Sequence, residues 1–251
     1  FARAARQARE ALNAMLDVRP PARAELFRFA DEADLALWKL FSDAELGGGS
    51  SVRLELRTRA SSDDAEGAAR ERAGTSASAS ASAPPRAWAA LTGHLSNTLG
   101  PGADERLKRS GFCGMKLPPR PQGDHIDLEP FDALRFRVRG DGRKYIATIQ
   151  TENWLVEHDD HDLWQAFLFA RKGEWDEVDV PLANFLQTWK GKLVEGRTEL
   201  SKHRVVSLGV AVAGGGLEPD GPYGLEIASV SAVRRRALAT REREERRKAK
   251  Q

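Results

Sequence analysis

The stretch of this chain best suited to binding a metal ion runs from Glu157 to Asp162 and reads EHDDHD. His158 and His161 are three residues apart among carboxylates, and imidazole and carboxylate groups are zinc ligands. Structural zinc prefers four well-placed ligands, however, and this stretch falls where a connection between two strands is expected. We predict a solvated loop and no metal, with a metal-dependent hydrolase as the alternative. A weaker cluster with the same interpretation contains Asp124, His125 and Asp127.

The glycine-rich stretch Gly47–Ser51 has the composition of a phosphate-binding loop but not its pattern. It lacks the lysine of a Walker loop, and the residues after it favour a strand and not a helix. We interpret these glycines as a turn that needs positive φ angles or a close backbone approach.

Residues for nucleophilic catalysis are not arranged in any pattern that supports it. The chain has no Gly-x-Ser-x-Gly elbow, and Ser110 has no base nearby in the sequence. Cys113 stands among apolar residues, which favours a buried, inert thiol. It is the single cysteine, so an intramolecular disulfide is impossible and a reducing compartment is indicated. We predict a protein that is not an enzyme and that has no catalytic residue, metal or cofactor.

Six tryptophans are available either to fill a core or to stack on sugar rings. Core positions are favoured, because most large aromatic side chains are heavily buried. Around Trp175, one phase of the strand holds Trp175 with carboxylates and the other holds valines, so either phase faces outwards or the strand is buried on both faces.

The elements that would position these residues are strands. Between Ala133 and Arg139, apolar residues alternate with arginines, which gives one apolar and one cationic face. The alternation resumes at Tyr145, after an Asp141-Gly142 pair that suits a tight turn. We predict a two-stranded antiparallel hairpin within Leu128–Thr151, and hence an all-β domain.

Further short strands separated by Gly or Pro indicate a sandwich or jelly roll between residues 26 and 233. A short helix or turn is expected at Ala183–Trp189. The predicted strands lie at 52–56, 88–95, 163–170, 175–182, 204–213 and 224–233.

Both ends of the chain are expected to be extensions of this domain. Residues 1–25 contain an Ala- and Arg-rich amphipathic helix followed by a Pro-rich linker. Residues 234–251 hold nine Arg or Lys and three Glu, a net charge of +6, so the rest of the chain carries −4. We interpret them as a basic helical tail that either solubilises the protein or binds an acidic partner.

The segment Ala60–Arg86 is rich in Ser, Ala and charged residues, and we predict a disordered insertion. Replacing it by a short Gly-Ser linker should leave the melting temperature nearly unchanged, because too little apolar surface is present to offset an ordering cost of about 1–2 kcal/mol per residue. Thermal unfolding of the shortened chain measures this. A large drop in melting temperature would show that the segment packs on the domain.

Seven fragments, taken in order, resemble those of one protein family. They are Trp38 with Ser42–Asp43, Gly47–Ser50, Arg109–Met115, Phe131–Leu134, Gly140–Tyr145, Trp175–Pro181 with Phe185, and Gly221–Ile227. Together they are similar to the thirty-kilodalton complex I intermediate-associated protein family, and the resemblance covers Phe27 to Val233. The insertion, the N-terminal helix and the basic tail are departures from the family pattern.

This resemblance implies a galactose-binding-like jelly-roll β-sandwich, here with helical N- and C-terminal extensions. It also implies a non-catalytic assembly factor of mitochondrial respiratory complex I, located in the matrix peripheral to the inner membrane. The implied partners are membrane-arm subunits or intermediates and other assembly factors, with possible contact to the inner membrane and none to nucleic acid. A retained accessory subunit and a carbohydrate-binding module of the same fold are the alternatives.

Arginines are the residues that we expect to contact such a partner, because a cationic strand face suits an acidic surface. Carboxylates from neighbouring strands that neutralise them are the alternative. The predicted contact residues are Arg135, Arg137, Arg139, Arg143, Arg234, Arg235 and Arg236.

Overall fold

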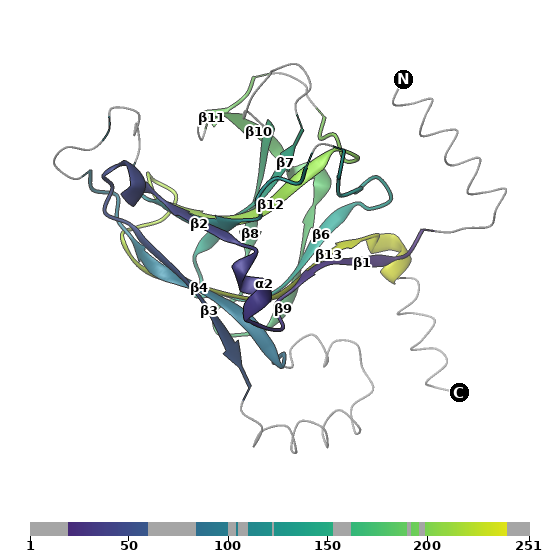
Figure 1. The fold of residues 1–251 in the computed structure, drawn as a ribbon, viewed down its shortest axis with the longest axis horizontal. Coiled ribbons are helices and arrows are strands. Elements are labelled where there is room, and N and C mark those ends of the chain that lie inside the picture. Colours follow the sequence, from purple (N-terminus) through teal and green to yellow (C-terminus); the bar gives the residue numbers. More distant parts are fainter. Residues whose placement is uncertain are drawn as a thin grey trace.

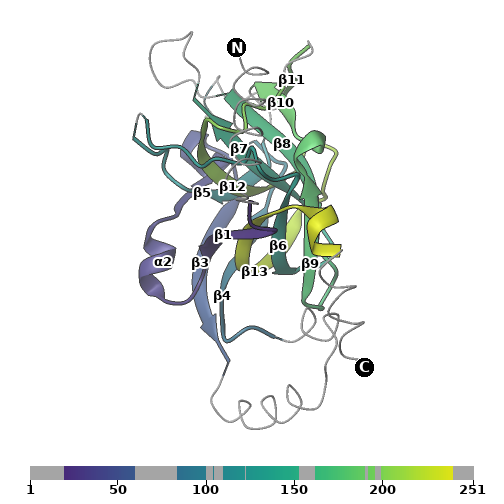
Figure 2. The ribbon, with the colours of Figure 1, turned by 90° about the vertical axis from the view of Figure 1, so that its right-hand side faces the viewer.

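In the computed structural model, two antiparallel sheets pack face to face (Figures 1 and 2). The structure describes residues 20–59, 84–99, 104, 110–121, 123–152, 162–189, 192–195 and 199–239. The predicted all-β sandwich is therefore confirmed. The predicted N-terminal helix and most of the insertion lie outside the described residues. The division of the chain into domain and extensions stays a prediction.

One layer is a six-stranded sheet in the order β3-β4-β13-β6-β9, with β1 also pairing with β13. Its strands are β1 (Arg23–Arg28), β3 (Ser51–Thr58), β4 (Ala87–Leu95), β6 (Ala133–Arg139), β9 (Asp176–Pro181) and β13 (Gly221–Val233). The central strand β13 is long enough to pair with β4 through its first half and with β6 through its second half.

The other layer is a seven-stranded sheet in the order β11-β10-β8-β7-β12-β5-β2. Its strands are β2 (Lys39–Ser42), β5 (Phe112–Lys116), β7 (Lys144–Thr151), β8 (Asp162–Phe169), β10 (Leu186–Trp189), β11 (Lys192–Leu193) and β12 (Val205–Ala213). The apolar run in β12 is buried almost throughout, on both faces of the sheet.

Helical structure in the described part of the chain is short. Helix α2 (Glu32–Ala36) begins with a capping box, in which the side chains of Asp31 and Asp34 each accept a hydrogen bond from the other residue's backbone N–H. Two 3₁₀ turns, η1 (Asp43–Leu46) and η3 (Leu182–Asn184), and a turn of helix at 235–239 complete the inventory. None of these described helices is long and apolar enough to cross a membrane.

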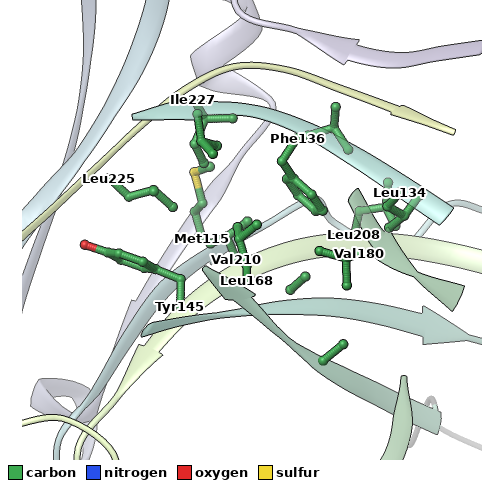
Figure 3. Close-up of a cluster of buried hydrophobic side chains, with 14 of the residues drawn as sticks. Met115, Leu134, Phe136, Tyr145, Leu168, Val180, Leu208, Val210, Leu225 and Ile227 are labelled. Carbon is green, nitrogen blue, oxygen red and sulfur yellow. The ribbon is translucent and has the colours of Figure 1, made fainter. Parts of the chain in front are cut away.

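The core lies between the two sheets, where the inward phases of their strands meet (Figure 3). Side chains from both layers, such as Met115, Leu168 and Val210 from one and Phe136 and Ile227 from the other, are almost completely buried. Strict alternation along β6 and β7 supplies part of this core, because successive side chains point to opposite faces of a sheet.

The predicted hairpin is wrong. Strand β6 pairs with β13 and β9, whereas β7 pairs with β12 and β8, so the turn after Arg139 passes from one sheet to the other. Both strands direct their apolar phase into the same core from opposite sides. Alternation fixes which face of a strand is buried but not which strand lies beside it.

The other expected strands are confirmed within a few residues, apart from the segment at 183–189. That segment is not a helix or turn throughout, because Leu186–Trp189 forms β10 beside β8 after the 3₁₀ turn η3. A strand of four residues is too short for alternation to be recognised in the sequence. The first described strand, β1, begins at Arg23.

The turn between the sheets still depends on Gly142, whose φ of +98° is unfavourable for a β-branched residue. Substitution Gly142→Val should destabilise the domain by more than about 1 kcal/mol. Gly224→Ala is the matched control, because its new Cβ would meet nothing closer than Thr92 Cγ2 at 3.9 Å. Equal urea midpoints for the two variants would contradict the role of the positive φ.

Candidate functional site

Of the arginines predicted to bind a partner, the three on β6 (Arg135, Arg137 and Arg139) lie on the outer face of the six-stranded sheet, beside strands that carry carboxylates. Arg135 forms a bidentate pair with Asp179 at 2.6 and 2.9 Å and reaches Glu177 at 3.0 Å. Arg23 of β1 donates to the same Glu177 at 3.0 Å. The alternative interpretation, neutralisation within the sheet, therefore describes Arg135. Contact of these arginines with a partner stays a prediction.

Arg139 occupies the most unusual position on this face. Its guanidinium lies 5.8 Å from the ring centroid of Trp88 and 5.4 Å from that of Trp175, and it also pairs with Glu226. Arg57 approaches Glu226 from the other side at 3.3 Å. Burial alone would raise the pKa of Glu226, but the hydrogen bond and charge of Arg139, with the charge of Arg57, hold it below its usual value.

Trp175, which lies next to Arg139, shows which face of the predicted strand at 175–182 points outwards. Trp175 points outwards with the carboxylates of β9 but is buried by Trp88 and Arg139, while Val180 faces the core. The Arg139 guanidinium with the two indoles near it forms a platform on this side of the sheet, held by cation–π contacts.

A hollow of about 220 Å³ lies beside this platform. Its floor is low because Gly224 has no side chain and the nearest atom to a Cβ built there is 3.9 Å away. Guanidinium groups, a hydroxyl and a carboxylate around it suit a small polar group. The lining residues are Arg57, Thr92, Arg139, Gly140, Gly173, Gly224 and Glu226.

Arg143 is held inside the domain. Its side chain is 14% exposed and donates to the backbone oxygens of Pro219 at 2.6 Å and Pro222 at 3.0 Å. The neighbouring Asp141 accepts hydrogen bonds from the N–H groups of Arg143 and Gly224 at 2.9 and 2.8 Å. These contacts hold the turn between the sheets against the start of β13, so Arg143 stabilises the fold at this point.

The three arginines after β13 lie near the first described residues of the chain. Arg234 donates to the backbone oxygen of Pro20 at 2.8 Å, and Arg235 pairs with Asp132 at 3.1 Å. Arg236 is also described, while the tail from residue 240 onwards lies outside the described residues. The structure therefore places these arginines at the opposite end of β13 from the hollow.

A second polar centre, the buried carboxylate of Asp43, is not predicted from the sequence. Asp43 is fully buried and accepts hydrogen bonds from Ser50 N and Oγ at 3.0 and 3.1 Å, from Ser110 Oγ at 2.8 Å and from Gly111 N. A Cβ at Gly48 would stand 2.3 Å from the carboxylate carbon, which explains that glycine. All donors are neutral, and the arrangement ties the connection between β2 and β3 to the connection between β4 and β5.

The remaining candidates show no chemistry in the described structure. His125 contacts Glu152 at 2.9 Å, a carboxylate that also pairs with Arg204. Burial raises the pKa of the Cys113 thiol, as expected for an inert cysteine. His158 and His161 lie outside the described residues. Within the described ranges, no three metal-ligating side chains gather.

A model of the family described as Complex I intermediate-associated protein 30 (CIA30) matches residues 27–227. The chain belongs to this family. A protein of Neurospora crassa named Complex I intermediate-associated protein 30, mitochondrial, is 28% identical over 83% of this chain and 73% of its own length. The mouse protein of the same name is 26% identical over 80% of this chain, which spans about half (53%) of that relative.

Solved structures similar to this CIA30 domain show its fold. The family 11 carbohydrate-binding module of cellulase Lic26A-Cel5E from Clostridium thermocellum has a TM-score of 0.53, with 10% identity over 85% of this chain and 95% of that module. The same module in complex with a β-1,3-1,4-mixed-linked tetrasaccharide has a TM-score of 0.50 at 11% identity. Both are jelly-roll β-sandwiches, which confirms the predicted fold class.

The fragments that indicate the CIA30 family come together at two places. Those at Ser42–Asp43, Gly47–Ser50 and Arg109–Met115 surround the Asp43 carboxylate. Those at Gly140–Tyr145 and Gly221–Ile227 contribute glycines and Glu226 to the hollow, with Trp175 alongside. The motifs of this CIA30 member thus build the surroundings of Asp43 and contribute Trp175 to the platform of the six-stranded sheet.

Proposed function

We propose that this protein is a non-catalytic assembly factor of mitochondrial respiratory complex I that binds membrane-arm intermediates. The observation that carries the proposal is the family match over residues 27–227, supported by relatives named for association with complex I intermediates in mitochondria. A matrix location peripheral to the inner membrane, contact with other assembly factors and a chaperone-like mode of action belong to the same proposal.

Loss of the protein should strongly deplete assembled complex I and leave the other respiratory complexes at their normal level. Native gels of mitochondrial membranes from a null strain, with and without re-expression of the full chain, measure this. Normal complex I in the null strain would overturn the proposal. A retained accessory subunit would instead appear in the finished complex at unit stoichiometry.

The basic tail is a proposed tether, and deleting Arg234–Gln251 should weaken association with intermediates. The effect should shrink as ionic strength rises, because attraction between exposed charges is screened by salt. Co-migration of the truncated and full chains with complex I intermediates, at low and high salt, measures it. Equal association at low salt would show that the tail only solubilises the protein.

Carbohydrate binding is a second candidate, favoured by two exposed phenyl rings on the seven-stranded sheet of a fold shared with carbohydrate-binding modules. Phe167 and Phe169 lie with ring centroids 5.9 Å apart. Titration with a β-1,3-1,4-linked tetrasaccharide tests this function. Saturable binding that is lost on Phe169→Ser would support it, and the absence of binding would leave the assembly function alone.

A further inference from the structure

The outer faces of the two sheets differ in charge. On the six-stranded sheet, arginines and carboxylates alternate and pair with one another. On the seven-stranded sheet, the outward positions of the strands hold three lysines, Lys39, Lys116 and Lys144, and no Asp or Glu. Within the described part of the chain, none of these lysine ammonium groups has a carboxylate at ion-pair distance, while the Glu218 carboxylate accepts a hydrogen bond from the Lys144 backbone N–H at 3.1 Å.

The arrangement of these lysines is unfavourable for the isolated domain. Lys39 and Lys116 are direct cross-strand partners on β2 and β5, and like charges at such positions destabilise a sheet. Lys116 Nζ lies 6.0 Å from the Phe41 ring, a cation–π contact that offsets little of this repulsion. Lys144 stands directly opposite Phe169. The lysines therefore give this face a positive charge, which favours binding of a negatively charged partner.

The same face exposes large apolar side chains. Phe167, Phe169 and Leu186 are 48%, 60% and 53% exposed, and the register of β8 and β10 places them on one side of the sheet. Leu193, opposite Thr188 at the sheet edge, continues this surface. Contiguous exposed apolar groups of this kind mark interaction sites in folded domains.

We infer that the outer face of the seven-stranded sheet is a docking surface for an apolar segment of a partner protein that carries carboxylates. Phenyl rings and leucines supply the apolar contact, and the lysines select the negative charge. The inference rests on the proposed function, because it takes the partner to be a component of a complex I intermediate. The rings stand on strands and not at loop tips, which favours a protein surface over insertion into a bilayer.

Re-expression of variants in the null strain tests this surface. Phe167→Ser with Phe169→Ser should lower intermediate-bound protein at least about tenfold, since one aromatic anchor is worth roughly that factor. Lys144→Glu should give a smaller loss. Leu37→Ser is the matched control, because Leu37 is 53% exposed but lies beside α2. Melting temperatures of the purified variants establish that each one folds.

Photo-crosslinking identifies what covers the face. Benzoylphenylalanine at position 167 should crosslink to a peptide of complex I that contains apolar residues and Asp or Glu, whereas the same probe at Glu55, on the other sheet, should not. Crosslinks to lipid alone, or Phe-dependent binding to vesicles of phosphatidylcholine mixed with cardiolipin, would overturn the protein partner. A null strain that lacks complex I but is fully restored by the double phenylalanine variant would overturn this inference and leave the proposed function intact.

Discussion

Asp43→Asn should destabilise the domain by about 3 kcal/mol or more, although the two side chains have nearly the same shape. Oδ1 of Asp43 accepts from the Ser50 N–H and Oδ2 accepts from the Gly111 N–H, in a site without water access. An amide has only one oxygen. Whichever way it is placed, one buried backbone N–H faces an NH₂ group and loses its acceptor.

Urea unfolding of the purified protein measures this loss as a shift in the midpoint at constant slope. Asp124→Asn is the control, because that carboxylate is 57% exposed and, among the described residues, its ion pair is with Arg120, four residues earlier in the chain. An exposed pair of this kind contributes about 1 kcal/mol at most. If the two variants unfold at similar urea concentrations, the Asp43 centre does not hold the β2–β3 and β4–β5 connections together.

The Asp43 centre shows where sequence reasoning ends. The glycines at 47–49 were correctly attributed to backbone constraints, since a Cβ at Gly48 would collide with the Asp43 carboxylate. Burial of the Asp43 carboxylate could not be predicted from the sequence, because the fold brings its partners Ser50 and Ser110 together. A buried acid without a nearby cation in the sequence is indistinguishable from a surface acid.

Strand positions were easier to predict than strand neighbours. Alternation in β6 located its apolar face, and the Asp141-Gly142 pair marked a real turn with positive φ at the glycine. The turn connects two sheets, however, and the pairing energy comes from β9 and β13, which are distant in sequence. The carboxylates that neutralise Arg135 could not be predicted for the same reason, because Glu177 and Asp179 belong to β9, which is distant from β6 in the sequence.

Arg139→Leu should cost about 2–4 kcal/mol at neutral pH, because it removes the main cationic partner of the Glu226 carboxylate, which is 12% exposed, and leaves Arg57 as the remaining paired cation in the described structure. Leucine can still fill the space between Trp88 and Trp175. The loss of stability therefore reflects the missing guanidinium charge more than the missing side-chain volume. Adding Glu226→Leu to Arg139→Leu should recover much of the stability, since replacing both members of a buried pair by apolar groups is often neutral.

The pH dependence of stability distinguishes the loss of the Arg139–Glu226 ion pair from a simple packing defect. In the native protein the pKa of Glu226 is lowered, so its contribution is present above the unfolded-state pKa of about 4.3 and is lost as pH falls through the folded value. Without Arg139, burial should raise the pKa of Glu226, and protonation should then stabilise the variant as pH falls. The stability difference between native protein and Arg139→Leu should therefore shrink from pH 7 towards pH 4, measured by urea unfolding across that range. A constant difference, or a double variant no more stable than the single one, would show that Arg139 acts through its contacts with the indoles and not through Glu226.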